Sequence, residues 1–289
     1  MTVAARGKQA VLKWIIAAVV LLLAGGALAA HLLYRSSMSE AETALADLAA
    51  RPRAAVGTFA ESMLVGLPDV AQRYFRHAIA PGTSLHTTVL LQMEGVFLLG
   101  DVDNFTSYAM QARQILSPPS EFVWIPNMAS GLMRIDGSDA LVNGAGWTRF
   151  WINGLLPVAN VRTSPDLVRS ALSRSAMEAV WAPASLLPSN GVRWEQQGPN
   201  TARLSFGTGI EPVYLTLDEE GRVLEVVTAR WSDANPEKTF RLQPFGGTAH
   251  AEITFGGFTI PSDLRVGNHY GTGAFLPFFQ ARVISAEYM

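Results

Sequence analysis

The sequence predicts a mainly β (α+β) protein: an N-terminal transmembrane helix followed by a large curved antiparallel sheet or incomplete barrel with a few helices. Three observations predict it. One apolar segment near the N-terminus is long enough to cross a bilayer. About eleven to thirteen β-branched or aromatic runs follow residue 84, and Gly, Pro, Asn or Asp separates them. Only a few stretches between these runs keep the period of an amphipathic helix.

The composition excludes several classes of protein. Charged residues make up only 16% of the chain, and the net charge of −2 offers no basic face for nucleic acid. The chain has no cysteine, so disulfides, thiolate metal sites and cysteine nucleophiles are excluded. The five histidines show no metal-ligand spacing, and no serine-nucleophile or phosphate-binding motif occurs. We therefore expect no metal, no cofactor and no nucleic-acid partner, and we assign no catalytic residue.

The first predicted element is a membrane-spanning helix over residues 14–34. Apart from His31, the run from Trp14 to Leu33 has no charged or strongly polar side chain. Because an α-helix rises 1.5 Å per residue, about 20 such residues span a hydrocarbon core of about 30 Å. The length of the run therefore favours a single-pass signal anchor.

Charges around this segment predict its orientation. Arg6, Lys8 and Lys13 precede it, so the positive-inside rule places residues 1–13 in the cytoplasm as a short tail. Most of the chain then lies on the periplasmic or extracellular side of the inner (cytoplasmic) membrane of a bacterium, an origin that fits the Arg-rich, Lys-poor composition. A cleaved signal peptide is the alternative, because Ala27–Ala29 resembles a small-x-small cleavage site. Both interpretations export the rest of the chain.

Residues 35–82 are predicted to form a helical stalk. An S/T-x-x-E capping box predicts a helix that starts at Ser39 and stops at a short break over 51–57. A further helix is expected from Pro68 to Pro81, because its apolar residues fall on one stripe. The stalk would connect the membrane segment to the sheet.

Residues 83–289 are predicted to form the curved antiparallel sheet. Strand-like runs recur from residue 85 to 135 and again from 192 to 288. One inserted helix, expected over 164–182, interrupts the series. Ser164 suits the N-cap and Pro165 the first helical position, and the apolar residues that follow keep helical spacing.

The part of the sequence from Trp124 to Trp181 is unusually rich in large apolar residues. A curved sheet has a concave apolar face, which this helix either fills as core or covers as the lid over a ligand. Aromatic residues and Met are typical of adaptable apolar cavities and also of ordinary cores. The predicted ligand-binding residues are Trp124, Trp147, Phe150, Trp151, Met177 and Trp181.

A charged residue in the inserted helix predicts an ion pair. Glu178 directly precedes the apolar residues Ala179 and Val180, and a buried carboxylate is costly without a partner. Arg193 is the partner we expect, since Arg can bind a carboxylate through two hydrogen bonds. The pair would either clamp the structure or contact the headgroup of a ligand.

Several segments of the exported part resemble an uncharacterised bacterial family of membrane-anchored or exported proteins. The resemblance covers residues 66–288 and is carried by Leu67-Pro68 with Arg73–Ala78, Pro81-Gly82, Glu94–Phe97, Pro118-Pro119 with Phe122–Trp124, Glu178–Pro183 with Leu186–Pro188, and Gly191–Glu195. That family has no established activity, so the resemblance implies no chemistry. The strand-rich layout also resembles the lipoprotein-carrier and lipoprotein-sorting group, whose half-barrels hold acyl chains under helical lids. This second likeness implies a fold and not a function.

Together these features predict an envelope-facing, membrane-anchored protein that binds an apolar ligand, a lipid or an acyl chain, in the concavity of the sheet. The alternative is a non-catalytic scaffold or interaction module of the cell envelope, with a filled core and another envelope protein as its partner. A hydrolase of unknown class is the third candidate, and the absence of catalytic motifs leans against an enzyme. An internal cavity favours the first function, whereas an exposed apolar patch favours the second.

Overall fold

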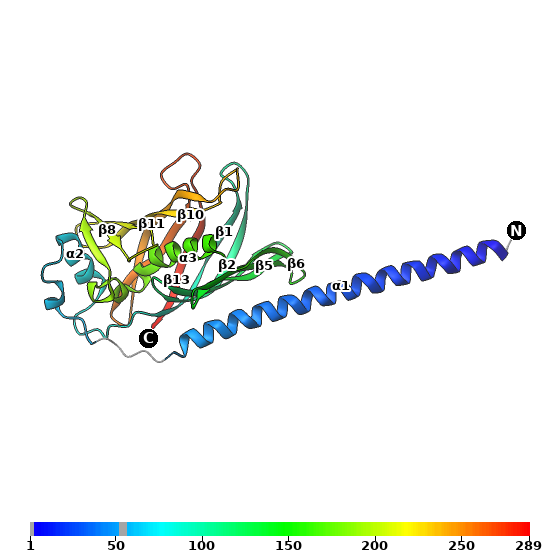
Figure 1. Ribbon diagram of the computed structural model, residues 1–289, viewed down its shortest axis with the longest axis horizontal. Coiled ribbons are helices and arrows are strands. Elements are labelled where there is room, and N and C mark those ends of the chain that lie inside the picture. Colours follow the sequence, from blue (N-terminus) through cyan, green and yellow to red (C-terminus); the bar gives the residue numbers. More distant parts are fainter. Residues whose placement is uncertain (1–2, 52–56) are drawn as a thin grey trace.

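The computed structural model describes residues 3–51 and 57–289, with side chains described from residue 12 onward. In this part of the chain, thirteen strands form one curved antiparallel sheet that does not close into a barrel (Figure 1). A long helix, α1 (Val3–Ala49), extends away from the sheet. The predicted fold class is therefore confirmed. The expected break over 51–57 falls mostly on residues 52–56, which lie outside the described residues.

Strands dominate the chain after α1. In chain order they are β1 (Val89–Gly100), β2 (Phe105–Ser117), β3 (Glu121–Ser130), β4 (Met133–Val142), β5 (Ala145–Ile152), β6 (Leu156–Val161), β7 (Arg193–Gln196), β8 (Thr201–Ser205), β9 (Val213–Leu217), β10 (Val223–Ser232), β11 (Arg241–Phe255), β12 (Phe258–Asn268) and β13 (Leu276–Tyr288). The shorter helices are α2 (Asp69–Ala78) and α3 (Pro165–Met177), with 3-10 turns at Glu61–Leu64, Glu178–Trp181, Pro183–Leu186 and Pro188–Asn190.

The strand order places the first strand in the middle of the sheet. It reads β6-β5-β4-β3-β2-β1-β13-β12-β11-β10-β9-β8-β7, so every neighbouring pair except β1 and β13 is consecutive among the strands. The β1–β13 seam runs from Val89 opposite Tyr288 to Phe97 opposite Phe279. As a result, β6 and β7 form opposite edges of the sheet although they follow one another in the chain.

The segment between β6 and β7 joins the two edges by crossing the concave face. It contains α3, which begins where the Ser164 hydroxyl accepts a hydrogen bond from the Leu167 backbone N–H at 3.1 Å. The helix ends at Met177 and continues as a 3-10 turn through Trp181, so the helix expected over 164–182 is shorter than predicted. α3 contacts β10 in one half of the sheet and β3, β4 and β5 in the other. The crossover therefore covers the concave face.

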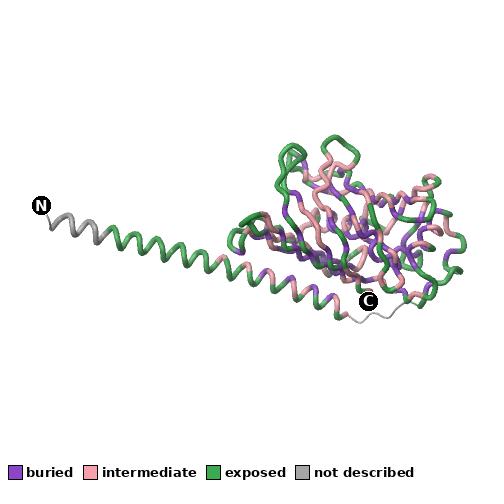
Figure 2. The backbone as a smooth tube through the Cα atoms, turned by 180° about the vertical axis from the view of Figure 1, so that it is seen from behind, coloured by how far each residue is buried: buried purple, intermediate pink, exposed green. Residues whose placement is uncertain are grey.

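α1 lies against the opposite, convex face with only its C-terminal part. No residue from 12 to 33 is buried, whereas Ala41, Leu45 and Leu48 are buried against the sheet (Figure 2). These three residues repeat at the spacing of one helical face. Since burial begins beyond residue 36, residues 36–289 contain every buried residue of the described chain.

The stalk helix does not begin at its predicted capping box. The apolar helix continues through Ser39 without interruption and ends at Ala49. Ser39 is exposed, and the residues after it are mostly Ala, Glu and Leu, which favour helix enough to carry α1 past the serine. The helix predicted from Pro68 is confirmed as α2, whose apolar stripe is buried.

Several strands are buried on both faces, which explains their unbroken apolar runs. Successive side chains of a strand point to opposite faces. In β3, Phe122 and Trp124 belong to the concave core, whereas Val123 and Ile125 pack under α1. The sheet thus separates one core under α3 from a smaller one under α1.

Candidate ligand-binding cavity

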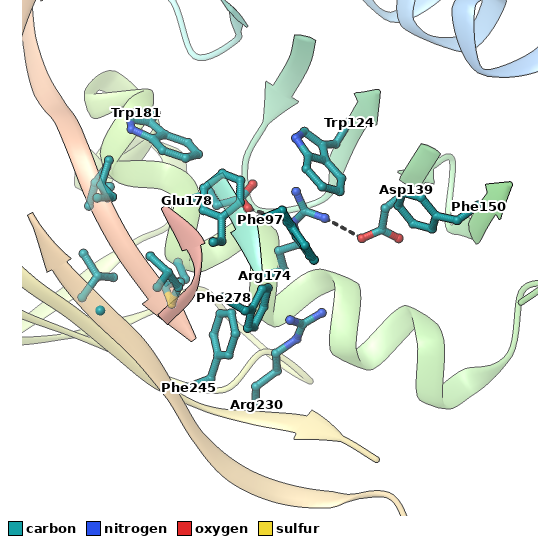
Figure 3. A pocket seen from close by; sticks show the side chains of 17 residues that line it. Phe97, Trp124, Asp139, Phe150, Arg174, Glu178, Trp181, Arg230, Phe245 and Phe278 are labelled. Atoms are coloured by element: carbon teal, nitrogen blue, oxygen red, sulfur yellow. Dashed lines mark hydrogen bonds and ion pairs between the residues drawn. The ribbon is translucent and has the colours of Figure 1, made fainter. Parts of the chain in front are cut away.

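A cavity of about 190 Å³ lies between α3 and the concave face of the sheet (Figure 3). It is slightly larger than the engineered cavity of about 150 Å³ that binds benzene, and smaller than the range of about 300–1,000 Å³ typical of ligand pockets. As it stands, the cavity has room for a short hydrocarbon segment.

Aromatic rings form much of the cavity wall. They come from strands of both halves of the sheet and include Phe97, Trp124, Phe150, Phe245 and Phe278. The ring centre of Phe97 lies 5.3 Å from that of Phe278 and 6.1 Å from that of Trp124. Trp124 lies 6.2 Å from Phe150. These are ordinary distances for packed rings, so the rings support one another around the cavity.

A buried polar network borders the cavity beside α3. The Arg174 Nε donates to Glu178 at 2.8 Å, and a guanidinium Nη donates to Asp139. The Gln114 side-chain amide donates to the second Glu178 oxygen at 2.6 Å, and Thr148 donates to the second Asp139 oxygen at 2.7 Å. Every charged group of the network therefore has a partner, as burial requires.

Two aromatic faces also hold the Arg174 guanidinium. Its central carbon lies 4.6 Å from the ring centre of Phe122 and 5.1 Å from that of Trp124. Burial disfavours the charge, but the carboxylates of Glu178 and Asp139 more than compensate, so the pKa of Arg174 is raised. Arg174 is thus a permanent cation fixed in position.

Arg230, on β10, is a second guanidinium at the cavity wall. Its Nε donates to the Ser170 hydroxyl at 3.1 Å, and its central carbon lies 4.8 Å from the ring centre of Phe245. Burial and the nearby positive charge of Arg174 lower the pKa of Arg230 to about 10, and attraction to Asp139 and Glu178 offsets only part of this. Arg230 therefore remains charged at neutral pH at an energetic cost.

The structure brings four of the six predicted ligand-binding residues to the cavity. Trp124, Phe150, Met177 and Trp181 line it. Trp181 is also fixed in place, because its indole N–H donates to the Pro261 carbonyl at 3.0 Å.

Trp147 and Trp151 do not line the cavity. Residues of β5 alternate between the faces of the sheet, so a strand that sends Phe150 into the concavity sends Trp151 and Trp147 to the convex side. There Trp147 packs under α1 and its indole N–H donates to the Ser138 hydroxyl at 2.9 Å. Trp151 lies 6.1 Å from the ring centre of Tyr34 of α1.

The predicted Glu178–Arg193 ion pair does not form. Glu178 is partly buried and paired, as expected, but its partner is Arg174, one helical turn before it. Arg193 is exposed and lies 3.0 Å from Glu195 on the same strand. Arg193 follows the 3-10 turns after α3, which carry it away from the cavity.

The sequence contained signals for two arginines at the cavity that the prediction missed. Arg174 stands four residues before Glu178, the spacing at which helical side chains meet. Arg230 falls on the same face of β10 as Val226 and Thr228, both buried, so strand alternation places it inward. In contrast, nothing local marks Phe97 or Phe278, which the β1–β13 seam brings to the cavity. Among the described residues, no group of three His, Cys, Asp or Glu side chains is placed to hold a metal ion.

Comparisons with known proteins give a family and two distant structural resemblances. A family model described as a family of unknown function (DUF6544) matches residues 57–281. No curated protein matches the chain. One similar solved structure is a domain from Vibrio parahaemolyticus named for outer membrane lipoprotein sorting, with 11% identity, a TM-score of 0.38 and coverage of 70% of this chain and 85% of that one. Another is a LolA superfamily protein from Nitrosomonas europaea, with 6% identity, a TM-score of 0.41 and coverage of 76% and 92%. The resemblances expected from the sequence are thereby confirmed.

Proposed function

Since the chain belongs to DUF6544, a family of unknown function, we propose its function from the cavity: it binds an apolar ligand, a lipid or an acyl chain, in the concavity of the sheet. The observation that carries this proposal is an aromatic-walled cavity enclosed between α3 and the sheet. A filled core would have left no such space. The proposed mechanism is burial of hydrocarbon, with no bond made or broken.

The size of the cavity sets the affinity to expect. Each buried methylene contributes about 0.8 kcal/mol, so a segment of about six carbons supplies about 5 kcal/mol. That corresponds to a dissociation constant of a few tenths of a millimolar. Tighter binding requires more of the chain to be buried, and displacement of α3 from the concave face would provide the room.

We propose further that α1 anchors the protein in the inner membrane, with the N-terminus in the cytoplasm and the sheet on the periplasmic or extracellular side. Residues Leu12–Ala49 form the one helix of the described chain that is long and apolar enough to cross a membrane, and its most apolar 18-residue window has a mean hydropathy of 2.4. No residue of its apolar part is buried, as is expected of a span facing lipid. A signal sequence passes the same test, so cleavage remains the alternative.

Native mass spectrometry tests the ligand proposal. Residues 36–289 retain every buried residue and can be exported and purified without detergent. We expect a discrete additional mass that extracts into organic solvent and is identified as a lipid or fatty acid. Val226→Phe should remove it by filling the cavity, whereas Val227→Phe, on the opposite face of β10, should not. An unliganded mass, repeated after incubation with total membrane lipid, would contradict the proposal and favour a scaffold.

A further inference from the structure

The Arg230 guanidinium has no carboxylate partner among the described residues. Its two contacts, the Ser170 hydroxyl and the Phe245 ring, supply no full negative charge. The nearest carboxylates, Asp139 and Glu178, are both engaged by Arg174. A desolvated charge without a counter-ion costs free energy, so this arrangement is stabilised by any anion that enters the cavity.

The cavity wall includes a second unsatisfied donor. The indole N–H of Trp124 is buried and has no hydrogen-bond acceptor among the described residues. Such a donor costs about 1–3 kcal/mol while it stays unpaired. Apart from Asp139, Arg174 and Glu178, which pair with one another, the rest of the wall is aromatic and aliphatic, as Figure 3 shows for the rings around Arg230. The cavity thus combines a largely apolar wall with one guanidinium, that of Arg230, which lacks an anionic acceptor.

We propose that the cavity selects an amphiphile with an anionic headgroup, a carboxylate or a phosphate ester, which Arg230 binds while the hydrocarbon chain lies against the aromatic wall. The inference rests on the proposed function, since it names the class of the apolar ligand. Guanidinium is suited to this task because it can offer two parallel N–H donors to a carboxylate or phosphate. An amphiphile with a neutral headgroup would leave the charge of Arg230 uncompensated.

Calorimetric titration of residues 36–289 with matched ten-carbon probes tests the headgroup. Decanoate and decyl phosphate should bind about tenfold more tightly than 1-decanol, because hydrogen bonds to charged groups contribute more than neutral ones. Arg230→Met should abolish this difference and leave decanol binding nearly unchanged. Arg193→Met, at an exposed arginine far from the cavity, is the control and should behave like the wild type.

The outcomes separate this inference from the proposed function. Equal binding of decanol and decanoate by the wild type overturns the headgroup preference while leaving an apolar site. If Arg230→Met binds none of the three probes, the arginine only supports the cavity wall, and this result also overturns the headgroup preference. Acetate or inorganic phosphate binding as tightly as the ten-carbon probes would identify a free-anion site instead. No binding of any probe contradicts the proposed function itself.

A different observation carries a second inference about the surface next to α1. Six large apolar residues are exposed on the β3–β4 turn, the β5–β6 turn and the edge strand β6: Leu132 (97%), Met133 (41%), Leu155 (44%), Leu156 (58%), Val158 (50%) and Val161 (46%). We call this set the turn patch. An exposed apolar edge strand is a liability in water, and proteins normally cover it.

The turn patch adjoins the end of the apolar segment of α1. The carbonyl oxygen of Gly154, in the turn between β5 and β6, lies 3.3 Å from the His31 Nδ1. Gly154 also packs on the Tyr34 ring. These contacts fall where the run from Trp14 to Leu33 ends, which is the level of the membrane surface if α1 spans the bilayer. In Figure 1, β6 lies beside α1 at the end of the sheet from which the helix extends away.

We infer that the turn patch docks on the outer face of the same bilayer that α1 crosses. The occupant is lipid because the patch is continuous with the apolar helix and lies at its boundary. This inference depends on the anchor and not on the cavity or its ligand. Burial of Leu155 and Leu156 in the interface would hold the sheet in one orientation relative to the membrane.

Because the chain has no cysteine, single-cysteine labelling of the full chain in phosphatidylethanolamine–phosphatidylglycerol vesicles tests this docking. An environment-sensitive fluorophore on Leu132→Cys or Leu156→Cys should shift to the blue and be quenched by doxyl-labelled lipid. The same fluorophore on Val65→Cys, 82% exposed near α2, should show neither effect. Water-like emission at all three positions would overturn the inference. A blue shift without lipid quenching would also overturn it, because a protein then covers the patch.

Discussion

Arg174 is the side chain that joins α3 to both the sheet and the end of its own helix. It pairs with Asp139 on β4 and with Glu178, and it packs on the rings of Phe122 and Trp124. Replacing both members of a buried ion pair by apolar residues can leave stability unchanged. Removing one member is destabilising, because the other charge stays buried without a partner. The network is therefore sensitive to single substitutions.

Glu178→Leu should lower the free energy of unfolding by about 3 kcal/mol, the lower end of the range for a broken buried pair, because Arg174 retains Asp139. Urea unfolding of residues 36–289 measures the change. Glu195→Leu is the matched control, since its partners Arg193 and Arg203 are more exposed and exposed ion pairs contribute little to stability. Equal losses for the two variants would mean that the network around Arg174 contributes no more than a surface pair.

At this scale the sequence predicted residue types better than residue positions. It identified Trp124, Phe150, Met177 and Trp181 as facing the concavity. Large apolar side chains next to an inserted helix must be buried, and the concave face of the sheet is the main surface that can bury them. It failed at Trp147 and Trp151 because the whole stretch was treated as one surface, although strand alternation separates neighbours. It failed at Arg193 because the path of the chain after α3 depends on 3-10 turns that no simple period reveals.

Among the elements, α1 has two different surroundings along one uninterrupted helix. Its first part is exposed and apolar, whereas its last turns cover the convex face over Ile115, Val123, Ile125 and Trp147. The capping box at Ser39 predicted a boundary that is absent, because a capping residue exposed within a helix costs little when good helix formers surround it. Only the tertiary contacts show that residues 36–49 belong to the sheet's core.

Deleting residues 1–49 should destabilise the sheet, whereas deleting residues 1–35 should not. The longer deletion uncovers the convex core and removes the buried Leu45 and Leu48, whose burial contributes about 2 kcal/mol each. For a domain of this size, a loss of about 4 kcal/mol corresponds to a fall of about 10 °C in Tm. Thermal unfolding followed by circular dichroism compares the two chains. Identical melting temperatures would contradict a stabilising role for the end of α1.

For the whole molecule, local pattern predicted most of the strands, but it missed β5 and β6 and did not give the strand order. Turns between consecutive strands are readable, and they account for every pairing on either side of the centre. The β1–β13 pairing joins Val89 to Tyr288, 199 positions away, and no local signal encodes it. The cavity could not be fully predicted for the same reason, since Phe97 and Phe278 face each other only across that seam.

The central seam also has a consequence for how the protein is made. Long-range strand pairing is slow because a long loop must close before its contacts form. Until β13 arrives, β1 and β12 both present unpaired edges, which are templates for association with other chains. If the chain is exported as proposed, the sheet is completed only after β13 has been translocated. Folding on the far side of the membrane would then depend on keeping the two open edges apart from other chains until β13 has paired with both.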